Sequence, residues 1–353
     1  MSYFVIGYYA LLIGASCVTA YMHQRQAFML LFSLTLVSFV VGIVFGVGGL
    51  WSITVAAGAL ALAAGTSYAF RELLVAILPE NTAKEMRTAP LTAAFGLFVI
   101  FTYAIAGIFA PIIAPYGQAE VVASAFAPAD ENLLLGADQL GRDLFSRIVY
   151  GARNTVGLAL GATILAFVLG ALAGLLAAVK GGWFDQMMGR VADVIMSIPS
   201  LIFALLLLSI FGTQLWILVV IVAIIYSPRV FRLTRAVAGN VVVMDYIEAA
   251  KLRGEGTWYL IRREILPNST APLIAEFGLE FCFVFLLIAG LSFLGLGIQP
   301  PTADWGSMVR ENATLISFGD VTPLIPAAAI ALLTVAVNFV VDWMLWRSAG
   351  LKE

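Results

Sequence analysis

The chain has 353 residues and a formal net charge of −2; 62% of its residues are apolar and only 11% are charged. Soluble domains carry about 25% charged residues, so this composition excludes a water-soluble globular protein and indicates a chain embedded in a lipid bilayer. The near-neutral charge indicates no particular partner, and we expect no nucleic acid among the partners.

The apolar residues gather into nine blocks, each long enough to cross a bilayer. A crossing helix needs about 20 mostly apolar residues, because lipid offers no hydrogen-bond partners to the backbone. The sequence therefore predicts an all-α polytopic membrane protein. In chain order, the predicted spans cover residues 3–21, 27–48, 51–70, 91–112, 154–179, 191–211, 214–231, 270–297 and 323–346.

The first three predicted spans form an appendage to the others. They are rich in Gly and Ala, and a charged stretch from Arg71 to Arg87 separates them from the other six spans. We therefore expect three parts: appended membrane helices at 1–88, a first core helix with an extracytoplasmic segment at 89–153, and a core domain at 154–353.

The orientation in the membrane follows from the basic residues, which are retained on the cytoplasmic side. With the N-terminus outside and the C-terminus in the cytoplasm, 15 of the 19 Lys and Arg residues face the cytoplasm. The opposite orientation would invert this bias. Two long segments, 113–153 and 298–322, then lie outside as ordered surface available to an external partner.

Residues that could carry chemistry are few. The cysteines and histidine, which are Cys17, Cys282 and His23, provide no set with metal-ligand spacing. No lysine follows a glycine, so a Walker A phosphate loop is impossible. We therefore expect no catalytic residue, metal or cofactor in this chain, and any ATP hydrolysis belongs to another polypeptide.

The largest predicted cytoplasmic loop covers residues 245–268 and reads DYIEAAKLRGEGTWYLIRREILPN. Asp245 can cap a helix that ends at the glycines beginning with Gly254. Residues 259–265 then form a second short helix, which Pro267 ends. A helix–turn–helix along the membrane surface suits the docking of a cytosolic partner. The alternative is a basic loop that only anchors the topology.

This loop resembles the EAA loop found in the permease subunits of ABC importers. That loop has Glu-Ala-Ala, then Gly after three residues, and Leu-Pro about a dozen residues later. The matching residues are Glu248, Ala249, Ala250, Gly254, Leu266 and Pro267. The resemblance implies that they form the loop that couples the permease to its ATPase.

Three further segments, 134–153, 181–207 and 291–311, resemble dipeptide and oligopeptide permeases of the DppC/OppC type. Examples are LLGADQLGRDLFSRIVYGAR in the first and LSFLGLGIQPPTADWGSMVRE in the last. Together with the EAA loop they cover most of residues 134–311. The first 88 residues fall outside the resemblance.

The resemblance implies a fold and a set of partners. The fold is the type I transmembrane domain of an ABC importer, here a six-helix core preceded by three extra membrane helices. The partners are a second homologous permease, two ABC ATPase subunits that bind ATP and Mg, and an extracytoplasmic substrate-binding protein, all at a bacterial inner membrane. The expected cargo is a di- or oligopeptide, although the same permease group also serves nickel chelates, glutathione and some sugars.

An acid inside a predicted span supports an alternative function. Intramembrane acids mark a polar path or a proton relay by default, and Glu280 is such a residue. Glu276 lies one turn before it on the same helix face. The alternative is a proton- or sodium-driven secondary transporter, although neither repeated halves nor paired midplane sites are evident. The nearby Arg229, Arg232 and Arg235 are expected to anchor the topology.

Overall fold

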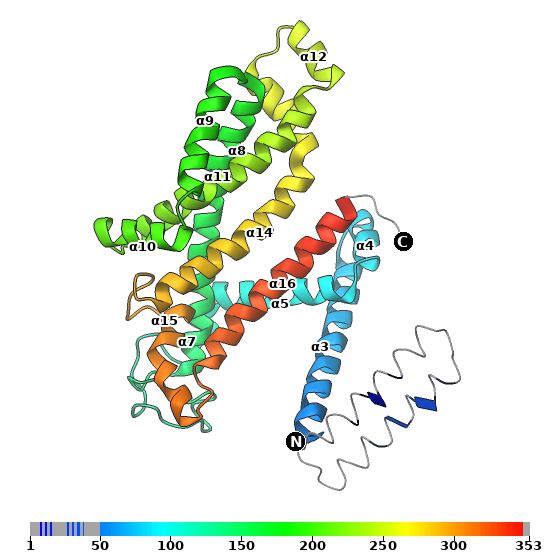
Figure 1. Cartoon of the computed structure of the whole chain (residues 1–353). Helices are drawn as coiled ribbons and strands as arrows, with labels where there is room; N and C mark the ends of the chain where they lie inside the picture. The colour runs from blue at the N-terminus through cyan, green and yellow to red at the C-terminus, as the bar shows by residue number, and fades with distance from the viewer. Residues whose placement is uncertain are drawn as a thin grey trace. The chain divides into compact units, whose positions relative to one another are not determined.

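The computed structural model describes residues 50–348, together with the isolated helical positions 8, 11, 12, 15, 27, 30, 31, 34, 35 and 38. Apart from these positions, the predicted spans 3–21 and 27–48 lie outside the described residues. Contacts divide the chain into two units, Met1–Leu73 and Leu74–Glu353. Figure 1 shows the second unit as a group of long helices.

The described chain is almost entirely helical, and its only strand-like pairings are two isolated bridges, Val121 with Arg142 and Ala137 with Asp143. The α-helices are α3 (Leu50–Ile77), α4 (Glu80–Arg87), α5 (Leu91–Ile108), α6 (Ala110–Ile113), α7 (Leu144–Gly151), α8 (Gly157–Lys180), α9 (Gly182–Met196), α10 (Ser200–Phe211), α11 (Leu215–Val242), α12 (Asp245–Leu252), α13 (Thr257–Tyr259), α14 (Leu266–Phe293), α15 (Trp305–Asn312) and α16 (Leu324–Ser348). Three irregular turns join them: the π-helical η1 (Ala152–Val156) and η2 (Leu260–Ile265), and the 3₁₀ turn η3 (Ala313–Phe318).

Six helices in the described part of the chain are long and apolar enough to cross a membrane, or seven if a bent pair counts as one span. They are Gly58–Ile77, Leu91–Ile108, Leu144–Lys180, Leu215–Val242, Thr257–Phe293 and Leu324–Arg347. The all-α polytopic fold predicted from the sequence is therefore confirmed.

The helix that contains the predicted span 51–70 is longer than that span. Helix α3 continues past Arg71 and Glu72, whose side chains form an ion pair at 3.3 Å, and ends at Ile77. Pro79 lies two residues after Ile77. A proline disfavours helical geometry in the residue before it, here Leu78, which explains why the helix ends there. The division between the two units lies inside α3, earlier than the boundary expected at residue 88.

Helices α8 and α11 form a closely packed pair in the second unit. Gly170 and Gly174 of α8 are four residues apart, as in the small-residue motifs of membrane helices. A Cβ built at Gly170 would lie 2.4 Å from the Ser227 carbonyl oxygen, and one built at Gly174 would lie 2.8 Å from the Phe231 carbonyl oxygen. The two glycines therefore let the backbones of α8 and α11 meet.

The predicted span 191–211 is wrong as a single helix. Helix α9 begins at Gly182 and ends at Met196, helix α10 begins at Ser200, and the two differ in direction by 87°. The break falls at Pro199, which has no N–H to donate to the preceding turn and which pushes Ile198 out of helical geometry.

Three other expectations misplaced a helix boundary. Helix α11 was expected to end at residue 231 but runs to Val242, and α8 continues the α7 helix through η1 from Leu144. The second short helix of the 245–268 loop does not end at Pro267; it continues as one helix, Thr257–Phe293. Pro267 comes directly after the π-helical turn η2, where the backbone already departs from α-helical hydrogen bonding, so the helix continues past the proline.

The ends of the second unit are occupied by different elements (Figure 1). Helix α12 lies beyond the ends of α8, α11 and α14, and we call this region the α12 end. Helices α7 and α15 lie at the opposite side, together with the loop between α6 and α7, and we call this region the α15 end. Helix α4 contacts the last helix through an ion pair between Glu85 and Arg347.

Candidate functional site

The α12 end holds the segment that the sequence analysis singled out. Helix α12 begins at Asp245, while Met244 occupies the N-cap position with extended backbone, and no side chain caps the helix. Asp245 is therefore not the cap that we expected. Together with Glu248 it lies in the first turn, where negative charge interacts favourably with the helix dipole.

Gly254 makes the turn that ends α12. Its φ angle is +82°, a conformation that L side chains rarely adopt, and its amide donates to the Lys251 carbonyl at 2.9 Å. The amide of Glu255 donates to the carbonyl of Ala250 at 3.2 Å, which completes the turn. No atom lies within 4 Å of a Cβ built at Gly254, so only the backbone requires glycine here.

The six predicted coupling residues divide between a buried and an exposed set. Ala250 is buried, and with Ile247 it packs against a cluster that the ends of α8 and α11 form with η2. The other residues, Glu248, Ala249, Gly254, Leu266 and Pro267, are exposed. Helix α12 is thus fixed on one side and open on the other.

The open side of the α12 end carries large apolar side chains that the sequence analysis missed. Leu252 is 84% exposed and Trp258 is 64% exposed, and Tyr246 is also exposed. The available signal was the presence of these apolar residues in an otherwise charged loop outside the predicted spans. An exposed apolar surface of this kind marks an interaction site.

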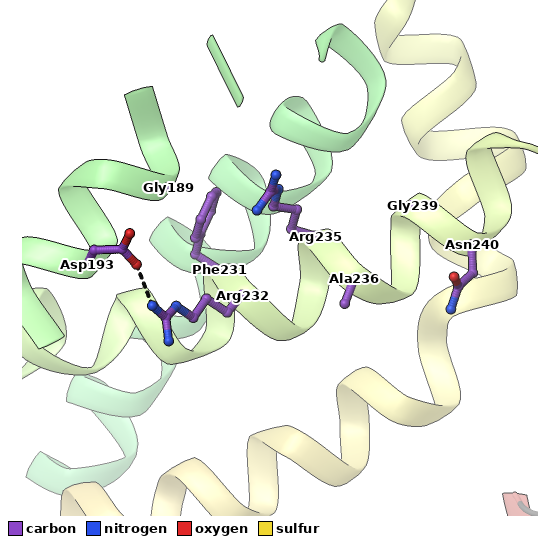
Figure 2. A pocket seen from close by; sticks show the side chains of 8 residues that line it. All are labelled: Gly189, Asp193, Phe231, Arg232, Arg235, Ala236, Gly239 and Asn240. Atoms are coloured by element: carbon purple, nitrogen blue, oxygen red, sulfur yellow. Dashed lines mark hydrogen bonds and ion pairs between the residues drawn. The ribbon is translucent and has the colours of Figure 1, made fainter. Parts of the chain in front are cut away.

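A cavity of about 560 Å³ lies beside α9 and α11, and Figure 2 shows eight residues that line it. The Asp193 carboxylate of α9 pairs with the Arg232 guanidinium of α11, and Arg235 pairs with Asp185. Arg232 and Asp193 are each about half exposed, so the pair lies where water can reach it.

Glu280, the candidate for a polar pathway, lies in α14 and is only 2% exposed. Its Oε2 atom has no hydrogen-bond partner in the described part of the chain. Glu276 lies one turn earlier and is half-buried. The structure therefore places one acid inside the helix group and the other at its edge.

The α15 end is held together by a buried group of four charged side chains. Arg142 contacts Asp138 at 2.7 Å and Glu311 at 3.0 Å, and Arg147 contacts the same two acids at 3.2 and 3.3 Å. These side chains are between 1% and 7% exposed. Each carboxylate is thus shared by two arginines, and the group joins the two segments that we expected to lie outside.

Trp305 is the largest fully buried side chain at the α15 end. Its Nε1 donates to the Ile148 carbonyl at 3.0 Å, and its ring contacts Tyr103 and Phe285 edge-on. The preceding residue, Asp304, caps α15 by accepting from the Ser307 amide at 2.8 Å. Burial raises the pKa of the Asp304 carboxyl, although the hydrogen bonds that it accepts oppose the rise.

Comparison with known proteins gives consistent matches. The family described as "Binding-protein-dependent transport system inner membrane component" matches residues 166–346. The di/tripeptide transport system permease protein of Pseudomonas aeruginosa is 35% identical over 254 residues, which is 70% of this chain and 84% of that protein.

Two further relatives have similar coverage. The dipeptide transport system permease protein of Alkalihalophilus pseudofirmus is 33% identical over 76% of this chain and 88% of its own length. The glutathione transport system permease protein of Pectobacterium atrosepticum is 32% identical over 77% of this chain and 94% of its own length.

Proposed function

The chain belongs to the family of binding-protein-dependent transport system inner membrane components, and we propose that it is the permease subunit of an ATP-driven importer of short peptides. In this proposal the N-terminus lies outside and the C-terminus in the cytoplasm. The α12 end then faces the cytosol, and the α15 end faces the substrate-binding protein. The peptide cargo is inferred from the relatives, two of which are named for di- or tripeptides.

The observation that carries the proposal is the two-sided character of α12. Its inner side is fixed, because Ile247 and Ala250 are fully buried against η2, α8 and α11. Its outer side presents Leu252 to solvent, and the following helix α13 presents Trp258. A partner that covers this apolar face would therefore push on the helix that begins at Thr257 and continues to Phe293. We assign that partner to the ATPase subunits, because this chain has no Walker A loop of its own.

The other partners follow from the same proposal. A second, homologous permease would complete the translocation path, and an extracytoplasmic binding protein would deliver the peptide to the α15 end. The four buried charges there make that end a firm platform, because Asp138 and Glu311 are each held by Arg142 and Arg147. ATP and Mg would bind to the ATPase subunits.

The test compares two glycines in matched surroundings. Gly254 has φ +82° and Gly319 has φ +79°, and neither has an atom within 4 Å of a built Cβ. Gly254→Asp and Gly319→Asp therefore impose the same backbone strain and the same new charge, but only the first does so at the proposed ATPase contact. Each variant is assembled with its partner subunits and reconstituted into liposomes.

We expect Gly254→Asp to insert normally and to lower both peptide uptake and binding-protein-stimulated ATP hydrolysis by more than about tenfold, since a change at the centre of an interface removes most of its binding energy. Gly319→Asp lies beside α15, where the binding protein is proposed to dock, so the readout that compares the two variants is the amount of ATPase subunit that co-purifies with the permease. This amount should stay within about twofold of the wild type for Gly319→Asp and should fall by more than about tenfold for Gly254→Asp. Full uptake by Gly254→Asp would refute the coupling role of α12.

A further inference from the structure

A second cavity, of about 360 Å³, lies where the α9–α10 span is broken. Its wall includes Pro199 and Ser200 at the start of α10, and Tyr226 and Arg229 from α11. The remaining lining is mostly aliphatic. The break therefore brings a helix start, two hydroxyl groups and a guanidinium to one cavity within the predicted membrane region.

Arg229 differs from the two arginines that follow it at three-residue spacing. Arg232 and Arg235 each pair with an aspartate of α9. Arg229 forms no ion pair and no hydrogen bond with any residue that the structure describes. Instead its guanidinium lies over the rings of Tyr226 and Phe283, at 5.2 and 4.9 Å from their centres. Cation–π contacts position the guanidinium and leave its five N–H groups for a ligand.

The start of α10 adds further donors. This helix has 12 residues, and no side chain caps its N-terminus. The first N–H groups of a helix have no partner within the helix and carry a partial positive charge, so they favour an anion. The hydroxyl groups of Ser200 and Tyr226 both lie in the wall of the cavity, and the Tyr226 hydroxyl donates to the Phe283 carbonyl at 3.2 Å. Broken membrane helices place such ends at the sites of anionic substrates.

Two acids of α14, Glu276 and Glu280, do not line this cavity. Neither carboxylate forms an ion pair with Arg229 in the described part of the chain, so the guanidinium has no protein anion as a partner there. A charge that remains unpaired within a membrane protein is costly. An unpaired guanidinium at a cavity in the predicted membrane region therefore suits a ligand with a negative charge.

We propose that this cavity is a subsite of the translocation path that binds the carboxylate of a zwitterionic peptide, with Arg229 as the binding residue. The inference rests on the proposed import of peptides and adds the group of the cargo that the permease itself contacts. The guanidinium and the start of α10 take the carboxylate.

The experiment compares a peptide with its C-terminal amide in the reconstituted complex. The probes are trialanine and trialaninamide, each at a concentration at which the wild-type complex imports it. The measured quantity is the uptake by Arg229→Gln divided by the uptake by the wild type, for each probe. The selectivity of the binding protein cancels in these ratios, because the same binding protein serves both complexes.

Arg229→Gln should lower trialanine uptake by about tenfold, the loss expected for one hydrogen bond to a charged group, and trialaninamide uptake by less than about twofold. Arg229→Lys should restore part of the trialanine uptake, because lysine keeps the charge without the planar fork. The matched control is Arg235→Gln, whose arginine pairs with Asp185; it should affect both probes equally.

The outcomes separate this inference from the function on which it rests. If the wild-type complex imports neither probe nor any other short peptide, the proposed function fails and the inference fails with it. If the wild type imports both probes and Arg229→Gln lowers them equally, with binding-protein-stimulated ATP hydrolysis preserved, the carboxylate site is refuted. The guanidinium then serves the helix packing or a lipid headgroup. If Arg229→Gln and Arg229→Lys lose the same share of trialanine uptake, the carboxylate site is likewise refuted.

Discussion

The α15 end and the α12 end use charged and aromatic residues in opposite ways. At the α15 end, Arg147 is 1% exposed and shares two carboxylates with Arg142, and Trp305 is fully buried. At the α12 end, Trp258 is 64% exposed, and between α9 and α11 the Arg232–Asp193 pair is about half exposed. The same residue types are thus enclosed by the chain at one end and presented to solvent at the other.

The difference shows which end is complete within the described chain. A buried charge needs fixed partners, and the α15 end supplies them from segments far apart in the sequence, as in the contact between Arg142 and Glu311. The apolar surface of the α12 end has no cover among the described residues. The first end is stabilised by its own contacts, whereas the proposed ATPase contact would cover the second.

The largest expected effect comes from the two tryptophans. Trp305→Ala should lower the free energy of unfolding by about 4 kcal/mol, because it leaves a cavity in a packed core. Trp258→Ala should change it by less than about 0.5 kcal/mol, because the side chain is mostly in solvent. Thermal unfolding of the purified variants in detergent measures both. Comparable losses in the two variants would contradict the contrast between the ends.

The Trp258→Ala variant also sharpens the contrast in the assembled complex. Trp258→Ala should weaken the binding of the ATPase subunits by about tenfold or more, as expected for an aromatic anchor at an interface. Titration of ATPase subunits onto the immobilised permease measures this affinity. The control is Trp216 of α11, whose side chain is 66% exposed. This residue lies away from α12, so Trp216→Ala should leave the affinity for the ATPase subunits unchanged.

The arginines should give the next largest effect. Arg147→Met leaves the buried Asp138 and Glu311 with one arginine in place of two, which should cost about 3 kcal/mol. Arg232→Met removes a half-exposed partner of Asp193 and should cost no more than about 1 kcal/mol. Unfolding of the two variants under identical conditions tests the difference. A small effect of Arg147→Met would show that the α15 end does not depend on its buried charges.

The smallest expected effect is the dependence of the free energy of unfolding on salt concentration. The Arg235–Asp185 pair is partly exposed, so Asp185→Asn should lower the free energy of unfolding by less than about 1 kcal/mol at low ionic strength. At about 1 M salt this difference should disappear, since charges near the surface are screened. The deficit of Arg147→Met should persist at both salt concentrations. The measurement is a pair of unfolding curves for each variant.

The sequence predicted the helical membrane fold well because lipid requires long apolar helices. The spans expected at 91–112, 154–179 and 323–346 correspond closely to α5, α8 and α16. Helix ends were harder to predict, because a helix can continue past the point where its apolar run stops. Helix α11 does so, running through Arg229 and on to Val242.

Two features of the sites could not be read from one sequence. The pairing of Arg142 with Glu311 joins residues 169 positions apart, and no local pattern indicates which charges will meet. Arg229, Arg232 and Arg235 have equal spacing, and the sequence favoured one role for all three. Whether each finds an acid depends on how α9 packs against α11, which only the three-dimensional structure determines. The turn at Gly254, by contrast, was predicted, because glycine is the residue that adopts positive φ readily.

The unbroken helix from Thr257 to Phe293 has a mechanical consequence. It contains 37 residues, so at 1.5 Å per residue it is about 55 Å long, whereas the hydrocarbon core of a bilayer is about 30 Å thick. If the helix tilts as one rod about a point within the membrane, its two ends move in opposite directions. A tilt of about 5° would carry its far end through about 5 Å relative to the other. A small displacement of the end near Thr257 would thereby be accompanied by a displacement of the end near Phe293, and so by a change in the width of the proposed translocation path.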